Sequence, residues 1–118
     1  MDIQSKPSVV NVELYDCSQA LVSSKEHIQD YVIQLCKLMD LKRVTDIEIY
    51  DDNGLGYLFH QTANGAYISG YFMPSTKCAN ITIFTLKPIL EDKPIALFSY
   101  DFFLAGKMDL NFMQRKII

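Results

Sequence analysis

Five side chains in the sequence carry a thiol or an imidazole, the groups that most often act as nucleophiles, general bases or metal ligands. They are Cys17, Cys36, Cys78, His27 and His60. The cysteines are odd in number and far apart, no pair has the C-x-x-C spacing, and neither histidine lies near a cysteine. These spacings do not fit a zinc site or a disulfide framework, so we expect reduced thiols and no metal.

The stretch from Gly65 to Lys87, GAYISGYFMPSTKCANITIFTLK, has the form of a hairpin with a site at its centre. Two runs rich in β-branched and aromatic residues flank a polar turn that contains Pro74 and Ser75. The stretch holds no Asp, Glu or His, and its one cysteine lies in the turn. The sequence therefore predicts a hairpin without the residues that usually carry out chemistry.

Length and composition indicate one domain over residues 1–118, with 49% apolar and 21% charged residues. The net charge of −3 provides no general attraction to nucleic acid or to an anionic membrane. The longest apolar runs are far shorter than the ~20 residues that a spanning helix needs. The N-terminus lacks the basic flank and the apolar core of a signal peptide. We expect a cytoplasmic protein with neither a nucleic-acid nor a membrane partner.

Periodicity predicts a half-buried strand over residues 8–18, followed by an amphipathic helix. Val10, Val12 and Leu14 alternate with polar residues in the strand. Ser23 and Glu26, three residues apart, predict a capping box at the start of the helix, within residues 23–41. The apolar residues of this helix recur at intervals of three and four, and Cys36 on the same stripe is expected in the core. They are Ile28, Tyr31, Val32, Leu35, Leu38 and Met39.

The rest of the chain predicts four more strands, a second helix and a short strand or tail. Asn53-Gly54 predicts a turn between two strands, because both residues tolerate positive φ. The hairpin of residues 65–87 supplies two further strands. Pro94 in the first turn and Gly106 at the end delimit a helix within residues 91–107. Residues 109–118 close the chain as a short strand or tail.

This order, β-α-β-β-β-β-α-(β), predicts an α+β fold: a two-layer α/β sandwich in which two helices cover one face of a mostly antiparallel sheet. The other face then lies uncovered. Aromatic side chains are plentiful in the strands expected there, and a large exposed apolar face requires a partner. The aromatic residues are Tyr57, Phe59, Tyr67, Tyr71 and Phe72. We therefore expect a homodimer formed sheet to sheet.

Three segments in this order, VVNVELYDCS, YISGYF and ITIFTLKP, resemble the small prokaryotic S-adenosylmethionine decarboxylase family, over about residues 9–107. The resemblance implies a pyruvoyl enzyme: a backbone bond before a serine breaks, and the serine becomes a pyruvoyl group that forms a Schiff base with the substrate. In that family a histidine assists the cleavage and a cysteine supplies the proton after decarboxylation. The products feed spermidine synthesis.

The sequence departs from this pattern at each reactive position. The family's serine falls within residues 63–67, where Asn64 and Ala66 stand and no Ser, Thr or Cys occurs. Asn64-Gly65 can form a succinimide, but that reaction yields no pyruvoyl group. Ser69 or Tyr71 occupies the place of the histidine, and Leu86 that of the cysteine. We therefore expect neither self-processing nor a pyruvoyl cofactor.

Four residues are candidates for ligand contact: Glu13, Tyr57, Ser69 and Tyr71. The leading hypothesis is a nucleoside-binding or regulatory dimer linked to polyamine or S-adenosylmethionine metabolism, with S-adenosylmethionine or a related nucleoside as ligand. One alternative is an enzyme that uses S-adenosylmethionine in a lyase or hydrolase reaction, aided by hydroxyl groups. Others are a decarboxylase processed at Ser69 and a structural dimer without ligand.

Overall fold

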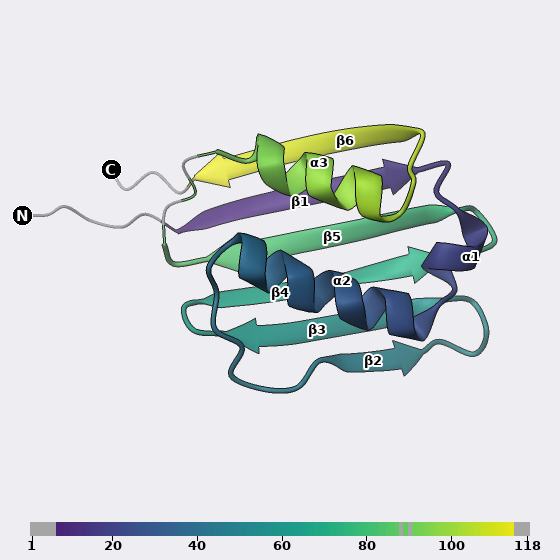
Figure 1. The fold of residues 1–118 in the computed structure, drawn as a ribbon, viewed down its shortest axis with the longest axis horizontal. Coiled ribbons are helices and arrows are strands. Elements are labelled where there is room, and N and C mark those ends of the chain that lie inside the picture. Colours follow the sequence, from purple (N-terminus) through teal and green to yellow (C-terminus); the bar gives the residue numbers. More distant parts are fainter. Residues whose placement is uncertain (1–6, 88, 90, 115–118) are drawn as a thin grey trace, which may run out of the picture.

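The protein is a six-stranded antiparallel sheet covered on one face by helices (Figure 1). The computed structural model describes residues 7–87, 89 and 91–114. The strands lie in the order β2-β3-β4-β5-β1-β6, and every neighbouring pair is antiparallel. Their bounds are β1 (Ser8–Tyr15), β2 (Glu48–Asp51), β3 (Tyr57–Ala63), β4 (Ala66–Met73), β5 (Cys78–Thr85) and β6 (Lys107–Gln114). The predicted α+β two-layer architecture is confirmed.

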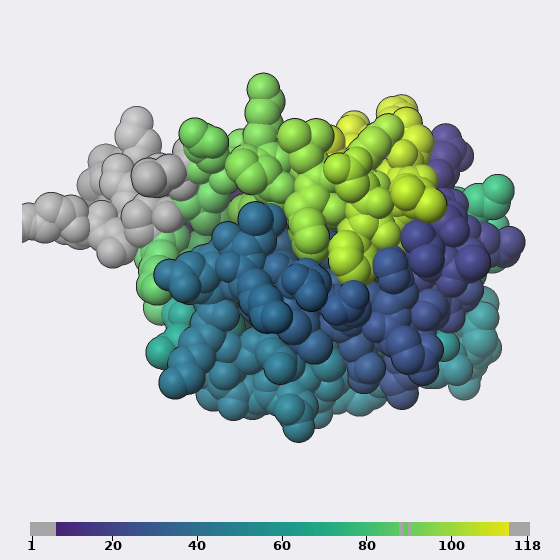
Figure 2. Space-filling model, viewed as in Figure 1, coloured from purple at the N-terminus to yellow at the C-terminus, as the bar shows by residue number. Residues whose placement is uncertain are grey.

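The described residues form three helices rather than the two predicted: α1 (Gln19–Val22), α2 (Lys25–Leu38) and α3 (Lys93–Phe102). From the helix side, α2 and α3 lie next to each other across the sheet and their side chains cover most of it (Figure 2). The unpredicted α1 is a single turn, capped by the Ser18 hydroxyl, which accepts from the Leu21 amide. One turn is too short to show helical periodicity, so the pattern of apolar residues could not reveal it. None of the described helices is long and apolar enough to cross a membrane.

The start of α2 differs by one residue from the predicted capping box. Ser24 is the cap, and its hydroxyl accepts from the His27 amide at 3.1 Å. Ser23 instead ends α1, and its hydroxyl donates to the Gln19 carbonyl at 2.7 Å. Ser23 thus ends α1 and Ser24 begins α2, and the sequence pattern alone could not show which serine caps which helix. The apolar stripe of α2 is buried as predicted from Ile28 to Leu35, whereas Leu38 is 48% exposed and Met39, just after the helix, is half-buried.

The end of α3 also corrects a prediction, because Gly106 does not terminate this helix. The helix ends at Phe102, and Leu104 adopts the left-handed conformation with φ of 51°. The Ala105 amide then donates to the Tyr100 carbonyl at 2.9 Å, which closes the last turn. Gly106 lies beyond it, where its amide donates to the Tyr15 carbonyl. From there β6, a full strand rather than a tail, runs beside β1.

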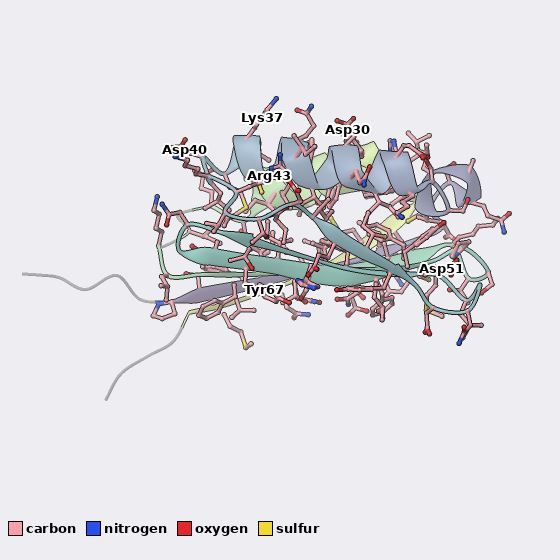
Figure 3. All side chains as sticks on the ribbon, turned by 90° about the horizontal axis from the view of Figure 1, so that it is seen from below. Asp30, Lys37, Asp40, Arg43, Asp51 and Tyr67 are labelled. Atoms are coloured by element: carbon pink, nitrogen blue, oxygen red, sulfur yellow. The ribbon has the colours of Figure 1, made fainter. Side chains whose placement is uncertain are left out.

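The uncovered face of the sheet holds fewer aromatic side chains than the sequence analysis expected. Tyr67 and Tyr71 lie there, 42% and 39% exposed. Phe59 and Phe72 lie under the helices, nearly or fully buried, and Tyr57 shares that face. Successive side chains of a strand point to opposite faces, so neighbours such as Tyr71 and Phe72 cannot share one. Figure 3 shows Tyr67 on the far side of the sheet from α2.

Gly70, in the middle of β4, makes room for the core beneath the helices. It pairs with Phe59 of β3, and a Cβ added at Gly70 would lie 2.9 Å from the Phe59 ring. The same Cβ would lie 2.0 Å from the Asn80 carbonyl oxygen of β5. The ring of Phe59 thus packs over a position where any side chain would clash. This packing explains the glycine in the middle of the YISGYF segment.

Candidate functional site

Three of the positions predicted to stand in place of reactive residues, Asn64, Ala66 and Leu86, gather at one end of the sheet. Asn64 and Gly65 form the turn between β3 and β4, and Ala66 opens β4. The amide of Leu86 donates to the Gly65 carbonyl at 2.8 Å, which places the end of β5 beside the turn. A hollow of about 330 Å³ is lined there by Asn64, Gly65, Leu86 and Lys87. We call it the turn hollow.

Hydroxyl groups are present near Ala66, but on other strands. Ala66, Thr85 and Ser8 stand opposite one another across β4, β5 and β1, and all three are buried. The Thr85 hydroxyl is engaged by the Lys87 backbone, as acceptor from the amide at 3.0 Å and donor to the carbonyl at 3.2 Å. The buried Ser8 hydroxyl has no hydrogen-bond partner among the described residues. The family's cleavage would need a hydroxyl on residue 66 itself, and neither Ser8 nor Thr85 supplies one there.

Ser69, the other serine of the hairpin, lies on the uncovered face in the middle of β4. In register it stands between His60 of β3 and Thr82 of β5. The Nε2 atom of His60 is 2.8 Å from Oε1 of Glu48, and the His60 ring stacks on Tyr50 with centroids 5.8 Å apart. Ser69 is thus three residues along the strand from Ala66, and it faces the opposite side of the sheet.

Glu13 lies on the same uncovered face, beside a second carboxylate. Asp109 of β6 stands opposite Glu13 in register. The Tyr15 hydroxyl lies 3.1 Å from a Glu13 oxygen and 3.3 Å from an Asp109 oxygen. The hydrogen bond to Glu13, followed by burial and the negative charges of both carboxylates, raises the pKa of Tyr15 to about 12. Tyr15 therefore stays protonated at neutral pH and acts as a hydrogen-bond donor to the two acids.

A second hollow lies at the opposite end of β4, where two predicted ligand contacts meet. Tyr57 and Tyr71 both line this cavity of about 180 Å³, which we call the tyrosine hollow. The carboxylate of Asp52 also lines the hollow, and the sequence around it signals only a turn, because Asp52 meets Tyr71 only in the folded sheet. The complete lining is Asp52, Leu55, Gly56, Tyr57, Leu58, Tyr71, Phe72 and Met73. β4 separates the two hollows by roughly 20 Å, given its rise per residue.

The histidines and the buried thiols differ in their surroundings. His60 lies on the surface of β3 beside Glu48, whereas His27 packs against the end of α3. Its Nε2 donates to the Phe102 carbonyl at 2.7 Å, and its ring packs against that of Phe102 at 4.3 Å. Burial raises the pKa of Cys17 to about 11 and also raises that of Cys36, so both are neutral thiols at pH 7. Within the described part of the chain, no three His, Cys, Asp or Glu side chains converge as metal ligands.

Comparisons with known proteins identify the fold and the family. The crystal structure of the adenosylmethionine decarboxylase from Aquifex aeolicus VF5 superposes with a TM-score of 0.81, covering 98% of this chain and 95% of that one, at 14% sequence identity. That likeness confirms the fold. A search of curated proteins found no match. The sequence of residues 8–116 matches the family described as S-adenosylmethionine decarboxylase. Because this match spans nearly the whole chain, the protein belongs to the S-adenosylmethionine decarboxylase family.

Proposed function

We propose that this protein neither processes its own chain nor decarboxylates S-adenosylmethionine. Instead it binds S-adenosylmethionine or a related nucleoside as a homodimer and acts as a binding or regulatory protein in polyamine or S-adenosylmethionine metabolism. The proposal rests on the identity of residue 66, an alanine, at the start of β4. Ala66 opens the hairpin strand beside Leu86, and neither residue has a group that can attack a carbonyl or transfer a proton.

Self-processing by the family's route needs a hydroxyl or thiol on the residue that follows the broken bond, because that side chain attacks the preceding carbonyl carbon. A methyl group at position 66 cannot do so. The hydroxyls of Thr85 and Ser8 belong to other strands, so attack by either would not convert the residue after the broken bond into a pyruvoyl group. Ser69 faces the other side of the sheet, away from the buried side chain of Ala66.

The tyrosine hollow supports the binding part of the proposal. It offers the aromatic ring of Tyr71, on the uncovered face, and the carboxylate of Asp52, while the side chain of Tyr57 lies on the helix side of the sheet. A sulfonium ion is attracted to the faces of aromatic rings and to a negative charge. The hollow is apolar elsewhere, with Leu55, Leu58 and Met73 in its lining, as suits the stacking of a nucleoside base. The turn hollow, with Lys87 as its only charged lining residue, provides no such attraction to a cation.

The uncovered sheet face supports the dimer. Large apolar side chains are exposed on this face at both ends of β4, on either side of the polar row His60, Ser69 and Thr82. Soluble monomers seldom expose this many large apolar side chains on one face. We call these residues the apolar patch: Leu58, Tyr67, Tyr71, Met73 and Phe84. A second copy packed on this face would bury both patches between two sheets, with the helices of each copy outside. Because Leu58, Tyr71 and Met73 also line the tyrosine hollow, the ligand would then lie at the rim of the dimer interface.

We expect the purified chain to remain intact. Mass spectrometry of freshly purified protein should give one species at the 13.5 kDa of the full sequence. Because no residue from 63 to 67 is a Ser, Thr or Cys, no cleavage at that turn should occur. A pair of fragments divided near residue 64 or 69, the second blocked by a pyruvoyl group, would instead establish a self-processing enzyme.

We expect calorimetry to detect binding of S-adenosylmethionine, and Asp52→Asn to weaken it. Removal of one charge near a cation in a partly solvated site should raise Kd roughly fivefold at low ionic strength. The matched control is Asp30→Asn, because Asp30 lies on the helix side of the molecule (Figure 3). Absence of binding heat, or an equal effect of both variants, would contradict the assignment of the tyrosine hollow. Chromatography of the same mixtures tests the alternative, because breakdown products would indicate a lyase or hydrolase.

A further inference from the structure

Two Asn-Gly dipeptides occur in the chain, and both lie in exposed turns. Asn53-Gly54 lies between β2 and β3, and Asn64-Gly65 joins β3 to β4. Asn-Gly is prone to deamidation because the glycine nitrogen can attack the asparagine side-chain carbonyl without steric hindrance. Both asparagines are exposed, and a Cβ at either glycine would meet no atom within 4 Å. Solvent access and crowding therefore do not distinguish the two sites.

The nitrogen that must attack at the first site is restrained. The Gly54 amide donates to the Asp51 carboxylate at 3.0 Å. This bond must break before the nitrogen can reach the Asn53 side chain. The attacking form is also a deprotonated amide, and a carboxylate at hydrogen-bond distance disfavours a second negative charge. Asp52 adds another carboxylate next to Asn53 in the sequence.

The corresponding nitrogen at the second site has no such restraint. Among the described residues, no group accepts a hydrogen bond from the Gly65 amide. The neighbouring charge also has the opposite sign, because Lys87 lines the turn hollow together with Asn64 and Gly65. A cation close to the turn favours the deprotonated amide. The turn itself is held in place, since the Asn64 amide donates to the Lys42 carbonyl at 2.8 Å.

From this contrast we propose that Asn64 is a site of spontaneous covalent modification, by deamidation through a succinimide, and that Asn53 is protected. The Gly65 nitrogen forms a bond to Cγ of Asn64, and the Cγ–Nδ2 bond breaks with release of ammonia. Water then opens the five-membered ring at either carbonyl, giving aspartate or isoaspartate. The net reaction consumes one water and converts an amide to a carboxylate, without oxidant or reductant.

The modification would change the turn hollow. A new carboxylate at position 64 would lie in the same hollow as the Lys87 side chain. The isoaspartate product also adds a methylene group to the backbone of the two-residue turn between the paired residues Ala63 and Ala66. A longer turn loosens the register that holds the start of β4 beside Leu86.

The test incubates the full chain at mildly alkaline pH in heavy-oxygen water and measures label incorporation by peptide mapping. Loss of one hydrogen bond and reversal of the neighbouring charge should make Asn64 react roughly tenfold faster than Asn53. In denaturant the two rates should converge, because the hydrogen bond to Gly54 and the nearby Lys87 are then lost and each asparagine is simply followed by glycine. Asp51→Ser should accelerate reaction at Asn53 and leave Asn64 unchanged. Equal rates in the folded chain, faster reaction at Asn53, or a difference that persists in denaturant would overturn the proposal.

Discussion

Phe72→Ala is expected to lower the free energy of unfolding by roughly 3–5 kcal/mol, as truncation of a fully buried aromatic residue usually does. Phe72 is 0% exposed and joins the sheet to both long helices. Its ring centroid lies 4.9 Å from that of Phe103 after α3, 6.5 Å from that of Tyr31 in α2, and 5.6 Å from that of Phe59 in β3. No neighbour can fill the space without losing its own contacts. Denaturant titration measures the change.

The control for this prediction is Leu97→Ala, which removes an apolar side chain that is 53% exposed on α3. A surface truncation of this kind should change the free energy of unfolding by about 0.5 kcal/mol or less. Both titrations should be repeated at several protein concentrations, because a dimer makes the transition midpoint depend on concentration. A loss at Phe72 as small as that at Leu97 would show that Phe72 is not the centre of the core.

If the proposed dimer forms, Tyr67→Glu is expected to convert it into a monomer at micromolar concentration. Tyr67 lies within the apolar patch, and a glutamate there would place a charge between two packed sheets, where it would be desolvated without a partner. Loss of a central aromatic contact alone costs 2 kcal/mol or more at many interfaces, so Kd should rise by roughly 30-fold at least. Light scattering across a concentration series should show the mass fall to that of one chain.

Leu97→Glu is the matched control, since it introduces the same charge at an exposed position on the helix side. This variant should retain the dimeric mass. If the unmodified protein scatters as a single chain even at high concentration, the sheet-to-sheet dimer is wrong, and the apolar patch must then bind another molecule. A Tyr67→Glu variant that stays dimeric would place the interface at a sheet edge instead.

The strands were predictable because their signals are local and strict. The alternation of Val10, Val12 and Leu14 gave the buried face of β1 directly. Asn53 and Gly54 both adopt positive φ, as their residue types predicted. The aromatic residues were harder to place, since residues at both odd and even strand positions were assigned to one face, and three of the five lie on the helix-covered face. The register of β4 against its neighbours decides this, and a long-range pairing is not encoded in any single segment.

The parts of the candidate site that are set by a turn and by neighbouring strands were predictable from the sequence. The parts that depend on packing between distant elements were not. Asn64, Ala66 and Leu86 lie together because the turn and the β4–β5 pairing bring them together. The association of Asp52 with Tyr71 was missed, because the two come from different elements and meet only at the rim of the folded sheet. Gly106 is a further example: its amide bonds to Tyr15, which is distant in the sequence, so its role has no local signal.

The position of β1 has a consequence for how this chain folds. The first strand lies between β5 and β6, the two strands that come last in the sequence. Until β5 has formed, β1 cannot join the rest of the sheet, and until β6 has formed, one edge of β1 stays unpaired. Such pairings between sequence-distant segments carry a large loop-closure cost and slow the folding of a domain. The hairpins β2–β3 and β3–β4 are local and can form early, so we expect closure of the sheet around β1 to be the slow step of folding.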